Sequence, residues 1–162
     1  MKKAIILLVC TLGIAGAGIF PSLGASILFP PDSDPVVYYH GGLGYAFPDG
    51  WDAQLGIGYA AWTSNGQDYS IMPLMGSGTY HLLSRESILD LYGGLGLGYA
   101  WRHWGDKGEQ DAPCGEVFVG SSLLLGKLFG IGISGGYMMD DLGHPDKGNI
   151  GVGLTLGIGV PF

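Results

Sequence analysis

The C-terminal segment Ile150–Phe162 alternates strictly between large apolar residues and small ones. Successive side chains of a β-strand point to opposite faces, so this segment predicts a strand with one apolar face and one nearly bare face. A soluble antiparallel strand usually places polar side chains on its outer face. A strand of a membrane barrel instead turns large apolar residues toward lipid and smaller ones toward the lumen. The segment therefore indicates a transmembrane β-strand.

The composition supports strands that face lipid. Glycine accounts for 32 of 162 residues, hydrophobic residues for 47% and charged residues for 13%, and the mean hydropathy is +0.31. An interior glycine costs a helix roughly 1 kcal/mol relative to alanine, which disfavours a helical protein. The length fits one domain. The high apolar content argues against a disordered chain, and the low charge argues against an ordinary soluble surface.

The N-terminus has the features of a secretory signal peptide. Lys2 and Lys3 precede the apolar run Ala4–Ile14, and small residues follow at Ala15–Ala17. We therefore predict a signal peptide at residues 1–17 and a barrel domain at residues 18–162. Cleavage after Ala25 is a second possibility. A membrane anchor is disfavoured because the run is shorter than the roughly 20 residues that a spanning helix needs.

Charge and cysteine content narrow the possible partners. The net charge is −7, and removing Lys2 and Lys3 leaves five basic residues against 14 acidic ones, a net charge of −9. Such a field makes nucleic acid an implausible partner. Cleavage of the signal peptide also removes Cys10. Cys114 is then the only cysteine, so no intrachain disulfide is expected. No residue spacing matches a metal motif, and we expect no metal and no cofactor.

Eight segments with period-two character predict an all-β fold, an eight-stranded antiparallel up-and-down transmembrane β-barrel. The segments are Ile19–Phe29, Val36–Phe47, Trp51–Thr63, Tyr69–Leu82, Ile88–Arg102, Glu116–Leu125, Ile131–Asp140 and Ile150–Phe162. Because such barrels begin and end in the periplasm, the first connection and every second one after it should face outward. The long gap His103–Gly115 is one of these outward connections.

Two segments leave alternatives open. Neither face of Tyr69–Leu82 is cleanly polar, and a bulge near Pro73 could switch its register. Val117–Met139 could be read as one long apolar helix, although its many glycines argue against a helix.

Aromatic residues gather near the predicted strand ends, as in the aromatic girdles of membrane proteins. The predicted girdle residues are Tyr39, Trp51, Trp62, Tyr69, Trp101, Trp104 and Phe162.

The chain resembles the small outer-membrane β-barrel family, the eight-stranded group that includes OmpA-type barrels. The segments Gly41–Phe47, Trp51–Tyr59, Leu91–Tyr99 and Leu154–Phe162 carry this resemblance. The resemblance implies a monomer in the outer membrane of a Gram-negative bacterium, reached after signal-peptide cleavage. It implies contact with outer-membrane lipid and lipopolysaccharide. It also implies that the barrel-assembly machinery reads a C-terminal signal, here Leu154, Leu156, Ile158, Val160 and Phe162.

Strand parity places several polar side chains in the lumen. At the outer end we predict a charge network of Arg102, Glu116 and Asp140, with His40 on the same inner face. Near the periplasmic end we predict inward-facing Asp52, Gln54 and Asp90. An eight-stranded barrel is nearly filled by side chains, but the many inward glycines predict unusual free space.

These residues favour a structural or binding protein without catalysis, with adhesion or a narrow channel as possible roles. Adhesion would use the His103–Gly115 loop. The alternative is a lipid A-modifying acyl hydrolase, which needs a serine and a histidine at the outer lipid boundary. Candidate residues are Ser64, His103, and His144 with Asp146, but no pattern marks a lipid-facing triad.

Overall fold

The computed structural model describes residues 18–30, 34–83, 88–125, 129–139, 141–143 and 149–158, without the side chains of residues 106, 124, 125, 129 and 149–158. The predicted signal peptide, residues 1–17, lies outside this part of the chain.

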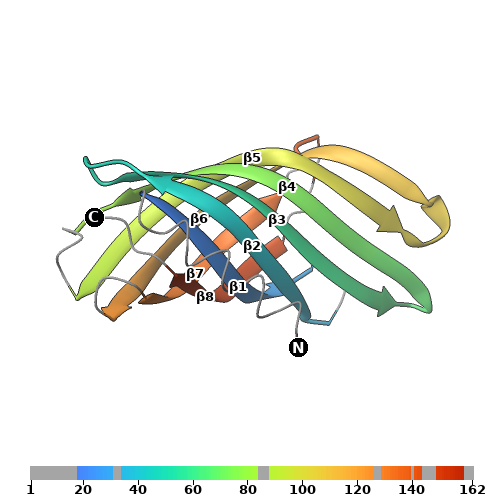
Figure 1. Ribbon diagram of the computed structural model, residues 1–162. Helices are drawn as coiled ribbons and strands as arrows, with labels where there is room; N and C mark the ends of the chain where they lie inside the picture. Colours follow the sequence, from blue (N-terminus) through green and yellow to red (C-terminus); the bar gives the residue numbers. More distant parts are fainter. Residues whose placement is uncertain are drawn as a thin grey trace, which may run out of the picture.

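The chain forms a closed antiparallel barrel in which each strand pairs with the next and the first pairs with the last (Figure 1). The strands are β1 (Ile19–Phe29), β2 (Val36–Ala46), β3 (Trp51–Ser64), β4 (Gln67–His81), β5 (Leu89–Trp104), β6 (Glu109–Leu125), β7 (Phe129–Met139) and β8 (Asn149–Ile158). The predicted eight-stranded up-and-down barrel is therefore confirmed.

The barrel has two unlike ends. At the long-hairpin end, β3 joins β4 and β5 joins β6, and both hairpins project beyond the rest of the barrel (Figure 1). Asn65 and Gly66 both have positive φ, as the two-residue turn between β3 and β4 requires. At the opposite, short-turn end, residues 47–50 connect β2 to β3. From the sequence we predict that the long-hairpin end faces outward.

The prediction of a long loop at His103–Gly115 is wrong, because most of this segment belongs to strands β5 and β6. β6 begins at Glu109, and only the short 3-10 helix η2 (Gly105–Lys107) and Gly108 separate it from β5. Glu109, Asp111 and Pro113 occupy outward positions there, so the apolar alternation that marks a lipid-facing strand is missing. Where a strand extends beyond the membrane, its outer face can carry charged residues. The start of β6 therefore lacks the apolar alternation by which the other strands were predicted.

The alternation of faces is continuous along the strands. In β5, Leu91, Leu95, Leu97, Tyr99 and Trp101 are exposed on the outside, whereas Asp90, Ala100 and Arg102 are buried inside. A monomeric soluble protein rarely exposes an apolar surface of this extent. The outer surface is suited to contact with lipid acyl chains.

β4 follows the same rule without a bulge. Its pairing with β3 keeps one register from Ile57↔Leu74 to Ala60↔Ile71, and its pairing with β5 is continuous. The suggested change of register near Pro73 is therefore wrong. Pro73 interrupts the β3–β4 pairing only locally, and its fully buried side chain faces the lumen.

The alternative of one long helix at Val117–Met139 is wrong, because this segment contributes to strands β6 and β7. The described chain contains no helix with the length and apolar character needed to cross a membrane.

Apolar side chains fill the lumen toward the long-hairpin end. Each of β1 to β7 contributes at least one residue to a single buried cluster: Leu28, Val36, Tyr38, Ala60, Ile71, Met75, Ala100, Cys114 and Met138. Ile71 is only 1% exposed, and Cys114 is completely buried. This apolar plug was not predicted from the sequence, which indicated a small, weakly polar lumen.

The inward glycines whose surroundings the structure describes leave little free space. A Cβ at Gly120 would lie 2.6 Å from the Tyr92 hydroxyl oxygen and 2.7 Å from the Ile133 carbonyl oxygen. A Cβ at Gly58 would overlap the Tyr38 ring. Large side chains therefore lie flat across the narrow lumen, and glycines on the neighbouring strands accommodate them. In the part of the lumen that the structure describes, the prediction of unusual free space is wrong.

Candidate functional site in the barrel lumen

The most concentrated polar cluster lies in the lumen at the short-turn end. His81, at the end of β4, contacts Asp52 of β3 through Nε2, with an Nε2–Oδ2 distance of 2.7 Å, and contacts Asp90 of β5 through Nδ1. Two carboxylates can both accept hydrogen bonds only if both ring nitrogens donate, as in the protonated imidazole. The three residues form a charge-assisted bridge between the ends of three adjacent strands.

This cluster is largely shielded from solvent. The side chains of His81, Asp52 and Asp90 are 16%, 11% and 4% exposed, and the buried Asp90 Oδ1 atom has no hydrogen-bond partner among the described residues. Next to it, the Gln54 amide donates a hydrogen bond to the Ser22 hydroxyl. The structure thus places Asp52, Gln54 and Asp90 in the lumen, at the end where the sequence analysis expected them.

His81 is the member that sequence reasoning missed. The faces of β4 were ambiguous because its inner face carries Ile71, Pro73 and Met75, which do not differ in polarity from its outer face. Counting by twos from Ile71 does place His81 inside, and its position at the strand end is close to Asp52 and Asp90. Fixing the register of this strand was the missing step.

The charge network predicted at the outer end does not form as one cluster. Arg102 is 7% exposed and faces inward, and its guanidinium lies 3.3 Å from an Asp141 carboxylate oxygen. Its Nε donates to the Gln110 carbonyl oxygen at 3.4 Å. Asp140 lies outside the described residues, so its part in the network stays a prediction.

Glu116 does not join Arg102. Arg102 pairs with Gln110 across β5 and β6, whereas Glu116 pairs with Gly96. Six residues of strand separate the two positions, which is about 20 Å at ~3.3 Å per residue. The prediction assumed that β6 starts at Glu116, but that residue lies in the middle of the strand. His40 also has other neighbours, because it lies 3.4 Å from the Ser26 hydroxyl and stacks on Tyr38.

The predicted girdle residues belong to two different faces. Tyr39, Trp51 and Trp101 are exposed on the outer surface, where Trp51 packs against Tyr80 with ring centroids 4.9 Å apart. These residues can serve as interfacial anchors.

Trp62, Tyr69 and Trp104 form an aromatic cluster on the lumen side of the long-hairpin end. The Trp62–Tyr69 and Tyr69–Trp104 centroid distances are 5.7 and 5.5 Å, and the Arg102 guanidinium lies 5.6 Å from the Trp104 ring centroid. Trp62 also packs against the apolar plug. Their assignment to a lipid-facing girdle is wrong, because a strand-end position does not fix the face.

The predicted assembly signal is only partly within the described chain. Leu154, Leu156 and Ile158 belong to β8, whose positions 154 and 156 pair with Ala25 and Leu23 of β1. Val160 and Phe162 lie outside the described residues, and recognition by the assembly machinery stays a prediction.

The geometry offers no support for a serine hydrolase in the described chain. Ser64 occupies an inward position on β3, whereas His103 is exposed on the outer face of β5, so these two candidates face opposite sides of the wall. His144 and Asp146 lie outside the described residues. Among the side chains that can be placed, no group of three or more His, Cys, Asp or Glu has a metal-binding arrangement.

Comparisons with known proteins identify the fold class. No family model and no curated protein matches the sequence. Among solved structures, Neisserial surface protein A (NspA) is 10% identical with a TM-score of 0.68, covering 88% of this chain and 96% of that one. The N-terminal β-barrel domain of Pseudomonas aeruginosa OprF is 18% identical with a TM-score of 0.60, covering 88% and 98%. The outer membrane enzyme PagL is 15% identical with a TM-score of 0.53, covering 86% and 99%.

The chain therefore has the fold of the small eight-stranded outer-membrane barrels, as its sequence resemblance implied. Its exposed apolar exterior and its fold are those of barrels that cross a membrane. At these identities the comparisons establish the fold and leave the activity open.

Proposed function

We propose that the protein is a closed, non-catalytic outer-membrane barrel that acts through the surface of its long-hairpin end. The observation that carries this proposal is the apolar plug, to which β1 through β7 all contribute. A water-filled channel needs a polar, open lumen. Here completely buried residues such as Ala60, Ala100 and Cys114 lie across the path. These contacts favour a structural or binding role over conduction.

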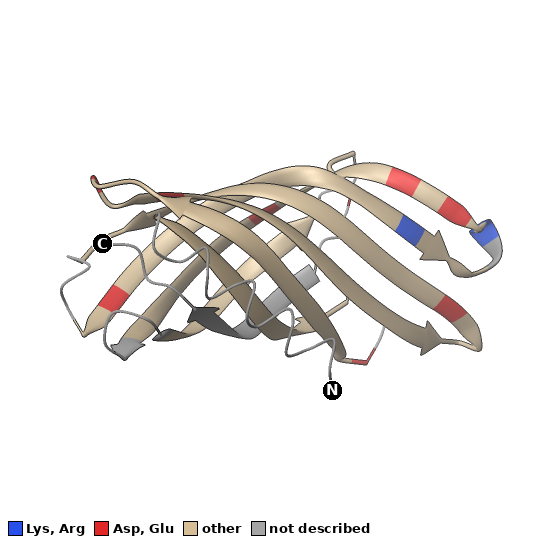
Figure 2. Ribbon diagram, in the orientation of Figure 1, with Lys and Arg blue, Asp and Glu red and all other residues tan. Residues whose placement is uncertain are grey.

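The long-hairpin end supplies a rigid surface for such a role. Hairpins β3–β4 and β5–β6 stay paired up to their turns, and the Trp62, Tyr69 and Trp104 cluster joins them. Charged residues gather toward the ends of the barrel, and exposed Asp68, Lys107, Glu109 and Asp111 lie on the projecting hairpins (Figure 2). Paired strands present a binding surface at a lower entropic cost than a flexible loop does.

The partners follow from this placement. We propose that the exterior contacts outer-membrane lipid and lipopolysaccharide, that the barrel-assembly machinery inserts the chain, and that the barrel works as a monomer without a cofactor.

Two measurements test the proposal. In planar bilayers, the refolded wild-type protein should give no stable open-channel conductance, whereas a steady ion conductance would contradict a plugged lumen. On the cell surface, replacing Gly105–Gly108 with a two-residue Asn-Gly turn should reduce binding to host-cell or matrix surfaces without lowering barrel yield. Unchanged binding by the shortened variant would contradict a role for this hairpin.

The acyl hydrolase remains the second candidate because PagL is described as an outer membrane enzyme and shares the fold. Mass spectrometry of lipid A from cells with and without the protein separates the two functions. Identical acylation patterns support the non-catalytic role, and loss of one acyl chain in the presence of the protein overturns it.

A further inference from the structure

The barrel wall parts between β2 and β3 near the long-hairpin end. The β2–β3 pairing runs from Ala46↔Asp52 to Tyr39↔Tyr59 and ends there. Beyond that point, Val36 and Val37 stay paired with β1, whereas Ala60 to Ser64 stay paired with β4. Each side of the opening is therefore held by its other neighbour, so the separation belongs to the architecture of the barrel.

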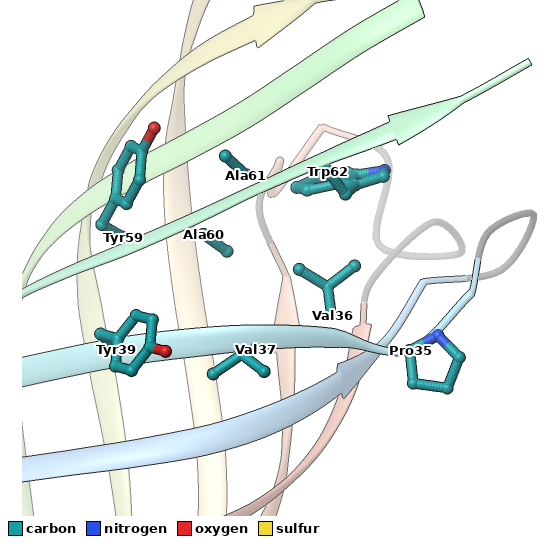
Figure 3. Close-up of a pocket in the computed structure, with 8 residues that line it drawn as sticks. All are labelled: Pro35, Val36, Val37, Tyr39, Tyr59, Ala60, Ala61 and Trp62. Atoms are coloured by element: carbon teal, nitrogen blue, oxygen red, sulfur yellow. The ribbon is translucent and has the colours of Figure 1, made fainter. Parts of the chain in front are cut away.

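A crevice of about 340 Å³ occupies this opening. Figure 3 shows Val36 and Val37 of β2 on one side of the gap and Ala60, Ala61 and Trp62 of β3 on the other, with Val36 and Ala60 pointing into it. The lining is apolar except for the backbone, the Tyr39 and Tyr59 hydroxyl groups and the Trp62 ring nitrogen. Its volume is within the range of small-molecule sites, which are roughly 300–1,000 Å³.

The crevice is lined by residues from both the outer and the inner face of the barrel wall. Val37, Tyr39, Tyr59 and Ala61 belong to the outer face, and the first three are about half exposed or more. Val36 and Ala60, by contrast, are part of the apolar plug, and Trp62 packs against it. The crevice is thus a lateral indentation that runs from the lipid-facing surface toward the plug.

We propose that this crevice binds one acyl chain of a surrounding membrane lipid. Its mouth is continuous with the apolar exterior, so hydrocarbon is the medium that reaches it first. Water inside the crevice would have few polar partners, whereas an acyl chain gains contact with the valine, alanine and indole surfaces. Tyr39 and Tyr59, at the mouth, have the amphipathic character that suits the boundary between acyl chains and headgroups. The proposal goes beyond the proposed function and holds whichever role the hairpins have.

The experiment fills the crevice from its lipid side. Ala61→Phe on β3 and Val37→Trp on β2 each add a ring at an outward residue that lines the mouth of the crevice, and Ala53→Phe is the matched control. Ala53 has the same outward parity as Ala61 on the same strand, but it lies where β2 and β3 are paired. Each protein is refolded into nanodiscs of phosphatidylethanolamine and phosphatidylglycerol that contain a phosphatidylethanolamine with a diazirine on its acyl chain. Heat-modifiable migration on gels confirms that each variant has folded.

The wild-type protein should show photo-crosslinks concentrated at residues 36–37 and 60–62, above the level elsewhere on the exterior. Ala61→Phe and Val37→Trp should remove this excess, and Ala53→Phe should retain it. Uniform labelling around the barrel, or an excess that persists in both filled variants, would overturn the proposal. Native mass spectrometry of the same samples tests whether a second copy of the chain occupies the crevice instead. A wild-type dimer that is lost in the filled variants would mean that a second copy binds there, and this result would also overturn the proposal.

Discussion

Replacing His81 with alanine tests the buried bridge at the short-turn end. His81 contacts Asp52 and Asp90, whose side chains are 11% and 4% exposed, so the substitution leaves two adjacent carboxylates without the cation between them. Breaking a buried ion pair by removing one partner costs roughly 3–5 kcal/mol. We expect His81→Ala to lower the free energy of unfolding by about 3 kcal/mol, the lower part of that range, because the cluster retains some access to solvent.

Equilibrium urea unfolding in lipid vesicles at pH 7, followed by tryptophan fluorescence, measures this loss. His103→Ala is the control, because His103 is exposed on the outer face of β5 and should change stability by less than about 0.5 kcal/mol. Adding Asp52→Asn and Asp90→Asn to His81→Ala removes both uncompensated charges and should recover part of the lost stability. If His81→Ala unfolds like the wild type, or if the triple variant is no more stable than His81→Ala, the reasoning is refuted.

Two further substitutions test the lumen and the exterior by the same unfolding assay. Gly120→Ala should cost about 1–3 kcal/mol because its Cβ would press on the Tyr92 hydroxyl group and the neighbouring backbone. Gly78→Ala, where no atom lies within 4 Å of the new Cβ, should be neutral or stabilising, and equal effects would contradict the packing argument. Leu95→Arg, at an outward position that is 61% exposed, should cost about 2–4 kcal/mol in a bilayer. Leu82→Arg, beyond the end of β4, should cost roughly 0–1 kcal/mol, and a matching loss at both sites would contradict the placement of the lipid-facing band.

The sequence predicted whether a residue faces the lumen or the exterior better than it predicted the position of that residue along the barrel axis. Period-two alternation is a local property, so Asp52, Asp90 and Arg102 could be placed in the lumen without knowing how strands pair. Height along the barrel depends on register and on where each strand begins. Because β6 begins at Glu109, Glu116 lies far from Arg102, and the predicted network could not form as stated.

The filling of the lumen was beyond the reach of single-strand patterns. An inward glycine looks like empty space until the neighbouring strand is placed beside it. Gly58 accommodates Tyr38, which comes from β2, and this pairing is visible only once the β2–β3 register is known. The same limit applies to His81, which acquires its partners from β3 and β5.

Site-directed spin labelling along β5 tests the central claim, that apolar side chains coat a closed barrel whose exterior faces lipid. A nitroxide is placed in turn at residues 91–101 of the protein in lipid vesicles, and its collisions with oxygen and with a water-soluble nickel chelate are measured. We expect high oxygen accessibility at odd positions such as Leu91, Leu95 and Leu97, and low accessibility at the even positions between them. Odd positions that are reached by the nickel chelate instead of oxygen, or accessibility without a period of two, would contradict the account.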